Sequence, residues 1–215
     1  NRQVSPEVAE EVLRFKRDGQ SNIDVIAAPS YHPDALGVLR TVRNNMNVYH
    51  FGEIPQHRDT PYRLMSYANG FVLQDWNDDF VTPAEKWRVV TERQPTAEQA
   101  RQMLVGWAFV TSVKSNAIVV PDRSMVPMTR GIGTGQTSRV RSLEIALKMA
   151  DAHASGGMVI SDGFMPFADN IERVHQAWAE IIVQPGGSIF DQRAIKMAND
   201  RNLIMVFTGQ RAFRH

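Results

Sequence analysis

The sequence contains no cysteine, which excludes a disulfide framework and fits a reducing compartment, so we expect a cytoplasmic protein. It also lacks any apolar run of about 18 residues, so it predicts no membrane span. Neither sign of charge is in excess, because 24 basic residues face 23 acidic ones and leave a formal net charge of +1. This balance gives no electrostatic reason to expect nucleic acid or an anionic membrane as a partner.

Metal-binding spacing is missing as well. None of the six histidines forms an HxxxH or HExxH pattern, so we expect no metal site and no metal requirement. What remains is the composition of an ordinary globular protein, with 43% apolar and 22% charged residues. The 215 residues are enough for one large domain or two small ones.

The start of the sequence is unusual, because residue 1 is Asn and a helix follows at once. Ser5 and Pro6 form a typical N-cap and first helical position. We expect a chain that begins this close to a capped helix to be part of something longer. Removal of a tag or of disordered residues is the simpler alternative.

The first half alternates helical and extended patterns. Apolar spacing predicts helices over 5–18 and from 33 to 42, and strands over 23–28 and 47–51. This strand–helix–strand unit indicates a parallel sheet. Further along we expect a strand over 67–74, an exposed connection over 76–86, an extended segment over 87–91, and a long helix capped by Thr96.

The second half is more regular and predicts an α/β fold, a three-layer α/β/α sandwich. It begins with a hairpin of strands 117–120 and 125–128 around a turn at 121–124. After it the pattern predicts helices and strands in alternation, namely helix 138–153, strand 158–160, helix 166–178, strand 181–183, helix 191–199 and strand 203–207.

The segment Lys114-Ser115-Asn116 lies where the period changes from helix to strand. Side chains at such a junction can converge on a pocket, but Lys and Asn also suit a helix C-cap, which this segment alone favours. The glycine-rich segment 131–136 can hold an anion on backbone amides, or can simply be a tight turn. It does not match a dinucleotide fingerprint, because Gln136 stands where the third glycine belongs.

Three further motifs follow predicted strands, at the edge where α/β folds bind ligands. They are the segments 161–170, 184–188 and 207–215. Helix capping by Asp162, core packing by Phe164 and Phe167, and an N-cap role for Ser188 would explain part of them. A solvated tail would explain the last.

Taken together, five motifs resemble the C-terminal part of the formyltransferase region in the AICAR formyltransferase/IMP cyclohydrolase family of purine biosynthesis. In order, they are Lys114–Ala117, Gly131–Arg139, Ser161–Asp169, Gln184–Ser188 and Phe207–His215. The resemblance extends upstream to residues 1–4 and 27–36, and is weakest over 49–87.

The resemblance implies two cytidine-deaminase-like halves, here residues 1–94 and 95–215. It implies transfer of a formyl group from the co-substrate 10-formyltetrahydrofolate to AICAR, giving FAICAR in de novo IMP biosynthesis, without a metal. It also implies a homodimer with shared active sites.

By position in the motifs, the resemblance assigns Asn116 to orienting the reacting groups, with Lys114 beside it as a second catalytic residue. It assigns Arg211 and Phe213 to the nucleotide. It assigns the folate to a larger set, namely Ser138, Arg139, Val140, Phe164, Pro166, Asp169 and Asn170.

The chain also departs from the family. The family's catalytic Lys–His pair lies upstream of the matching part, and the 215 residues contain no Lys-His dipeptide and no cyclohydrolase domain. Gly163 and Met165 stand where the family commonly has Ala and Phe. We therefore expect a C-terminal fragment of the enzyme, whose partner would be the N-terminal part of the same protein. The alternatives are a non-catalytic folate- or nucleotide-binding module and a paralogue acting on another amine.

Overall fold

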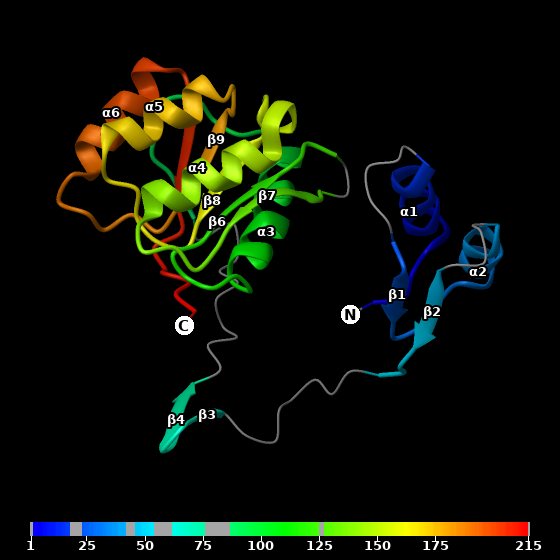
Figure 1. Ribbon diagram of the computed structural model, residues 1–215. Helices are drawn as coiled ribbons and strands as arrows, with labels where there is room; N and C mark the ends of the chain where they lie inside the picture. Colours follow the sequence, from blue (N-terminus) through cyan, green and yellow to red (C-terminus); the bar gives the residue numbers. More distant parts are fainter. Residues whose placement is uncertain are drawn as a thin grey trace. The chain divides into compact units, whose positions relative to one another are not determined.

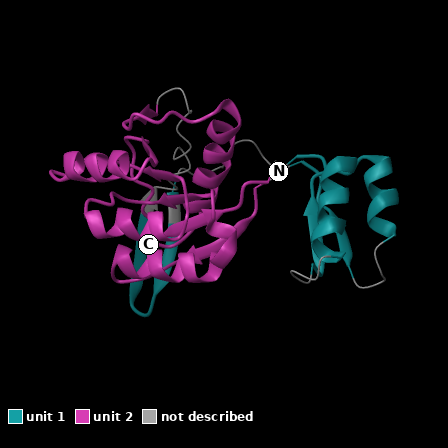
Figure 2. Cartoon of the chain, turned by 90° about the horizontal axis from the view of Figure 1, so that it is seen from above, with its two compact units in different colours: residues 1–76 teal, residues 77–215 magenta. Residues whose placement is uncertain are grey.

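A computed structural model describes residues 2–17, 23–41, 46–53, 62–75, 87–124 and 127–214. The chain forms two compact units, residues 1–76 and 77–215 (Figure 2). The predicted connection over 76–86 lies outside the described residues, as do residues 1 and 215.

The first unit begins with the predicted strand–helix–strand pattern, which is confirmed. Helix α1 (Pro6–Arg17) precedes β1 (Val25–Ala28), α2 (Pro33–Arg40) and β2 (Asn47–His50), and the two strands pair in parallel. Helix α1 packs against α2. Their small core consists of Val4, Ala9, Ala28, Ala35 and Leu39.

A hairpin follows in place of the single strand predicted over 67–74, which was wrong. Strands β3 (Tyr62–Tyr67) and β4 (Gly70–Asp75) are antiparallel, with Tyr67 opposite Gly70. Ala68 and Asn69 form the turn between them. Asn followed by Gly is a strong turn signal, and it divides the apolar run into two strands.

The second unit is built on a six-stranded mixed sheet in the order β5-β10-β9-β8-β6-β7. Strands β8 (Met158–Ser161), β9 (Ile181–Gln184) and β10 (Ile204–Phe207) are parallel to one another. At one edge β5 (Arg88–Val89) is antiparallel to β10, and at the other β6 (Ile118–Pro121) is antiparallel to both β8 and β7 (Thr129–Gly133).

Helices cover both faces of this sheet (Figure 1). Helix α3 (Ala97–Val110) packs Met103, Trp107 and Val110 on one face. The other face is covered by α4 (Arg139–Ala150), α5 (Ala168–Gln176) and α6 (Asp191–Asp200). A short 3₁₀ helix, Asp151–Ala154, extends α4. Successive strand residues alternate between the two cores, with Val159 in one and Ile160 in the other.

The predicted cap at Thr96 is present, and one predicted strand is displaced. Thr96 forms a capping box with Gln99 at the start of α3, as expected. The hairpin exists, but its second strand is β7 at Thr129–Gly133, so the predicted strand was wrong at residues 127 and 128, while residues 125 and 126 lie outside the described residues. The strand starts later because the carboxylate of Asp122 accepts hydrogen bonds from the Met128 amide and from the Arg130 side chain.

Candidate functional site

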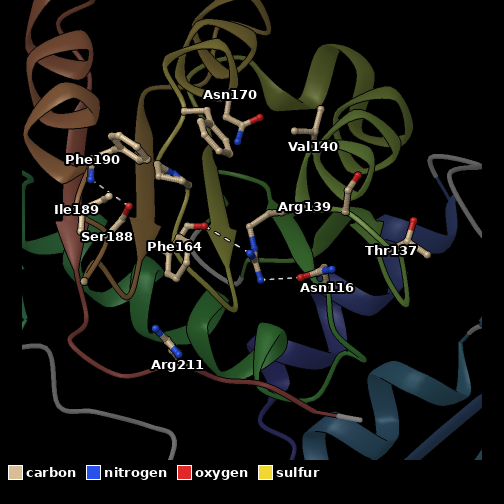
Figure 3. Close-up of a pocket in the computed structure, with 14 residues that line it drawn as sticks. Asn116, Thr137, Arg139, Val140, Phe164, Asn170, Ser188, Ile189, Phe190 and Arg211 are labelled. Atoms are coloured by element: carbon tan, nitrogen blue, oxygen red, sulfur yellow. Dashed lines mark hydrogen bonds between the residues drawn. The ribbon is translucent and has the colours of Figure 1, made fainter.

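A cavity of about 610 Å³ opens at the carboxyl ends of the parallel strands, where α/β folds bind ligands (Figure 3). Segments that follow β8, β9 and β10 meet the start of α4 around it. Its lining consists of Asn116, Thr137, Ser138, Arg139, Val140, Phe164, Pro166, Phe167, Asn170, Gly187, Ser188, Ile189, Phe190 and Arg211.

Most of the residues assigned from the motifs line this cavity, namely Asn116, Ser138, Arg139, Val140, Phe164, Pro166, Asn170 and Arg211. The other three lie nearby but are not part of its lining. Lys114 is exposed in the segment between α3 and β6, and Asp169 is exposed in the first turn of α5. The half-buried ring of Phe213 lies 5.7 Å from the guanidinium carbon of Arg211.

Asn116 does not cap a helix. Helix α3 ends at Val110 with Thr111 as its C-cap, so the alternative favoured by this segment alone was wrong. The Asn116 side chain is held at both ends: its Nδ2 donates to the Gln136 carbonyl at 2.9 Å, and its Oδ1 accepts from Arg139 Nη2 at 2.8 Å. Its own carbonyl accepts from the Ser142 hydroxyl at 2.6 Å.

Arg139 is the polar centre of the site. Its Nη2 donates to Asn116 and, at 2.9 Å, to Asp162 Oδ1, and its Nη1 donates to the Phe164 carbonyl at 3.4 Å (Figure 3). Its Nε is buried and has no hydrogen-bond partner among the residues that the structure describes. A buried donor without a partner is costly, so Nε favours a ligand that brings an acceptor.

Helix capping was an alternative explanation for Asp162 at the level of sequence, and the structure shows another role. It is fully buried, and its Oδ2 accepts from the Ser115 hydroxyl at 2.5 Å while its Oδ1 accepts from Arg139. Gly163 makes this pair possible, because a Cβ there would lie 2.3 Å from Arg139 Nη2. Both partners are distant in sequence, so no local pattern indicated the contact.

The opposite wall of the cavity is apolar and aromatic. The rings of Phe167 and Phe190 are 6.3 Å apart, and Pro166, Val140 and Ile189 extend the same surface. The guanidinium carbon of Arg211 lies 5.4 Å from the ring centre of Phe164, within cation–π range. Sequence reasoning missed Ile189 and Phe190, because the motif that it used, Gln184–Ser188, ends just before them.

Asn170 gives the apolar wall one polar atom. The residue is 1% exposed, and its Oδ1 is buried without a hydrogen-bond partner in the described part of the chain. Ser188, tested as an N-cap, instead accepts from the Phe190 amide at 3.2 Å, and Phe190 is the residue that precedes α6. The cavity therefore combines flat apolar walls with an amide oxygen able to accept an N–H group from a ligand.

The glycine motif is explained by packing. Gly131 and Gly133 lie in β7 rather than in a turn, and Cβ atoms there would stand 1.9 and 2.0 Å from the carbonyl oxygens of Ala146 and Ser142 in α4. Only glycine lets the strand and the helix approach this closely. These contacts account for the two glycines without a bound anion.

Two kinds of feature are absent from the described residues. They contain no cluster of three or more histidine, aspartate or glutamate side chains placed to hold a metal ion. Among the same residues, no helix has the length and apolar character needed to cross a membrane.

Comparison with known proteins places this geometry in context. The protein-family model of the AICARFT/IMPCHase bienzyme matches residues 1–149. The bifunctional purine biosynthesis protein PurH of Streptococcus agalactiae serotype III is 40% identical over 197 residues, and the PurH protein of Streptococcus pyogenes is 41% identical over the same length. Each alignment covers 90% of this chain and 37% of the relative. The chain therefore spans little more than a third of the length of these relatives.

Proposed function

Because this chain belongs to the AICARFT/IMPCHase bienzyme family, we propose that it provides the folate-binding part of an AICAR formyltransferase site. The reaction is transfer of the formyl group of 10-formyltetrahydrofolate to the 5-amino group of AICAR, giving FAICAR on the route to IMP. The observation that carries the proposal is the cavity itself, where aromatic walls surround the unpartnered amide oxygen of Asn170.

The cavity walls suit a flat heteroaromatic ring. A pterin would lie against Phe164 and Pro166, and its N–H edge would donate to Asn170 Oδ1, which otherwise stays unpaired. The buried Nε of Arg139 would in turn receive an acceptor atom of the ligand. Ser138 and Val140, at the start of α4, would fix the ligand from the side.

Arg211 and Phe213 suit the nucleotide, because a guanidinium pairs with phosphate and an aromatic face stacks on an imidazole. The amine of AICAR is a weak nucleophile, so the reaction needs positioning and a stabilised oxyanion. We propose that Asn116 orients the reacting groups, since both ends of its side chain are held. Lys114 stays a candidate for proton transfer, and its exposed side chain would have to move toward the ligands.

The architecture supports a finer assignment. We infer that residues 95–215 form one cytidine-deaminase-like half, a three-layer arrangement with helices on both faces of its sheet, and that residues 1–94 belong to the other. Strand β5 would then be contributed by the first half to the sheet of the second. We propose a homodimer with shared active sites, which sedimentation would test.

The central experiment is a pair of measurements on the 215-residue chain. Calorimetric titration with a non-reactive 10-formylfolate analogue should show binding, and a formyl-transfer assay with AICAR should show no turnover. The expected loss is about 10²–10⁴ in rate, because the chain lacks the Lys–His pair that the resemblance assigns to acid–base catalysis. Adding the part of a PurH relative that this chain does not cover should restore turnover.

Two results would contradict the proposal in different ways. A folded chain that does not bind the analogue would refute the folate assignment. Normal turnover by the chain alone would show that its own residues complete the acid–base chemistry. Binding without turnover in the presence of that part of a PurH relative would favour the alternative of a non-catalytic binding module.

A further inference from the structure

We propose that Asp162 is a positioning residue that holds the folate side and the nucleotide side of the site in one fixed arrangement, an inference that rests on the proposed function. Its carboxylate is fully buried at the end of β8, and its two oxygens have different partners. Arg139 occupies one oxygen and the Ser115 hydroxyl occupies the other.

The first arm leads to the folate side. The Arg139 guanidinium donates to Asp162 and to Asn116 through the same nitrogen, at 2.9 and 2.8 Å. The ion pair therefore fixes the positions of the Asn116 amide and of the buried Arg139 Nε at the wall of the cavity. Without the carboxylate, a long arginine side chain has no charged group to hold it against this wall.

The second arm leads to the segment 208–214, which carries Arg211 and Phe213. The Ser115 hydroxyl that donates to Asp162 also accepts from the Arg214 amide at 3.0 Å, and the Ser115 amide donates to the Arg214 carbonyl at 2.9 Å. The Asp162 carbonyl accepts from the Ala212 amide at 2.9 Å. Asp162 and Ser115 thus hold the chain at Ala212 and Arg214, on either side of Phe213 and directly after Arg211.

The arrangement needs a charged group rather than a polar one. A buried carboxylate accepts from a hydroxyl and a guanidinium together, whereas an amide at the same place offers one acceptor and turns an N–H group toward the other partner. Asp162→Asn is therefore nearly the same size, but it removes the charge that pairs with Arg139 and leaves one acceptor atom for the two partners. Ser115→Ala leaves the ion pair and the bond from the Ser115 amide to the Arg214 carbonyl in place, and removes the hydroxyl that connects Asp162 to the Arg214 amide.

The chain offers a closely matched control in Asp122. This buried carboxylate also accepts from one serine hydroxyl, Ser124, and from one arginine, Arg130. It lies in the same unit but does not line the cavity. Asp122→Asn should reproduce the general cost of neutralising a buried carboxylate without touching the site.

The test begins without ligand, by hydrogen exchange of the Ala212 and Arg214 amides in the 215-residue chain. Asp162→Asn and Ser115→Ala should each accelerate exchange at Arg214 at least tenfold, and Asp122→Asn should leave it unchanged at an equal loss of melting temperature. Equal acceleration in Asp122→Asn would reduce Asp162 to general stability and overturn the inference. Unchanged exchange in Ser115→Ala would do so as well, even if Asp162→Asn fails to fold.

Ligand titration completes the test. Asp162→Asn should weaken binding of both the 10-formylfolate analogue and AICAR about tenfold or more, whereas Ser115→Ala should weaken AICAR more than the analogue. Equal losses for both ligands in Ser115→Ala would overturn the division into two arms. A wild-type chain that binds neither ligand would refute the proposed function, while the exchange measurement would still decide the role of Asp162.

Discussion

The family resemblance assigned two adjacent residues, Asp169 and Asn170, to folate binding, but their environments in the structure differ. Asp169 is exposed in the first turn of α5, where a carboxylate complements the helix dipole. Asn170 lies in the cavity wall with an unpartnered buried oxygen. A buried acceptor without a partner contributes to affinity only when a ligand supplies the missing N–H group.

We expect Asn170→Ala to weaken binding of the folate analogue about tenfold or more, because the ligand's N–H group would then be buried without an acceptor, at a cost of ~1–3 kcal/mol. Asp169→Ala is the neighbouring control, with a loss below about 1 kcal/mol of helix stability. Calorimetry with the analogue and with AICAR would compare them. The reverse order of effects would give the pterin contact to Asp169.

The carboxyl group of Asp122 makes a prediction about pH. Burial by itself raises its pKa, but the hydrogen bonds from Ser124, Met128 and Arg130 outweigh burial and hold the pKa below the ordinary value of 3.8. A carboxyl group with a lowered pKa stabilises the folded state above its unfolded-state pKa. That stabilisation is lost as the pH falls through the lower pKa of the folded protein.

We therefore expect Asp122→Asn to cost about 1–3 kcal/mol near neutral pH, and the cost to shrink as the medium becomes more acidic than pH 3.8. Urea unfolding of the wild type and the variant across this range would measure the difference. A constant difference at every pH would show that the ionised carboxylate contributes no net stability.

At the scale of elements, the contact between β7 and α4 depends on two glycines. Cβ atoms at Gly131 and Gly133 would stand 1.9 and 2.0 Å from helix carbonyl oxygens, and backbone cannot yield as a flexible side chain does. The same helix begins at Arg139, and the hydroxyl of its N-cap Ser138 accepts from the Arg141 amide. Because Ser138 and Arg139 both line the cavity, the position of α4 also determines the position of the cavity wall.

Gly131→Ala should destabilise the second unit by about 1–3 kcal/mol or more through overpacking, and should weaken folate binding as α4 is displaced. Gly37→Ala is the control, because a Cβ there meets nothing within 4 Å and α2 favours alanine, so stability should rise by about 0.4–1 kcal/mol. Thermal unfolding followed by circular dichroism would test both. An unchanged melting temperature in Gly131→Ala would contradict the close packing.

At the scale of the whole molecule, the two units have separate cores. Leu39 belongs to the small core around α1 and α2, and Leu143 belongs to the core between α4 and the six-stranded sheet. Small cores bury less apolar surface and are less stable. We expect the first unit to unfold before the second.

The matched substitutions Leu39→Ala and Leu143→Ala should each cost about 2–5 kcal/mol and should each lower a different calorimetric transition. The first should affect only the lower-temperature transition, and the second only the higher one. A single transition shifted by both variants would show that the units unfold as one cooperative body.

Local rules predicted much of the fold, whereas the site residues were assigned by the family resemblance. Period and capping residues indicated α3 with its Thr96 cap, the buried strands β8, β9 and β10, and the helices between them. Eight of the residues that the resemblance assigned line one cavity. The errors lie at β3–β4 and β7, where a turn or a buried aspartate changed the start of a strand.

What the sequence by itself determined was the alternation of elements and the strand ends at which the site is built, because hydrophobic period and capping are read from near neighbours. Only the tertiary structure decided that Asp162 joins Ser115, 47 residues away, to Arg139, and that α4 packs closely against Gly131 and Gly133. Those contacts depend on the packing of elements distant in the chain, and a buried charge acquires its partners only when that packing is complete.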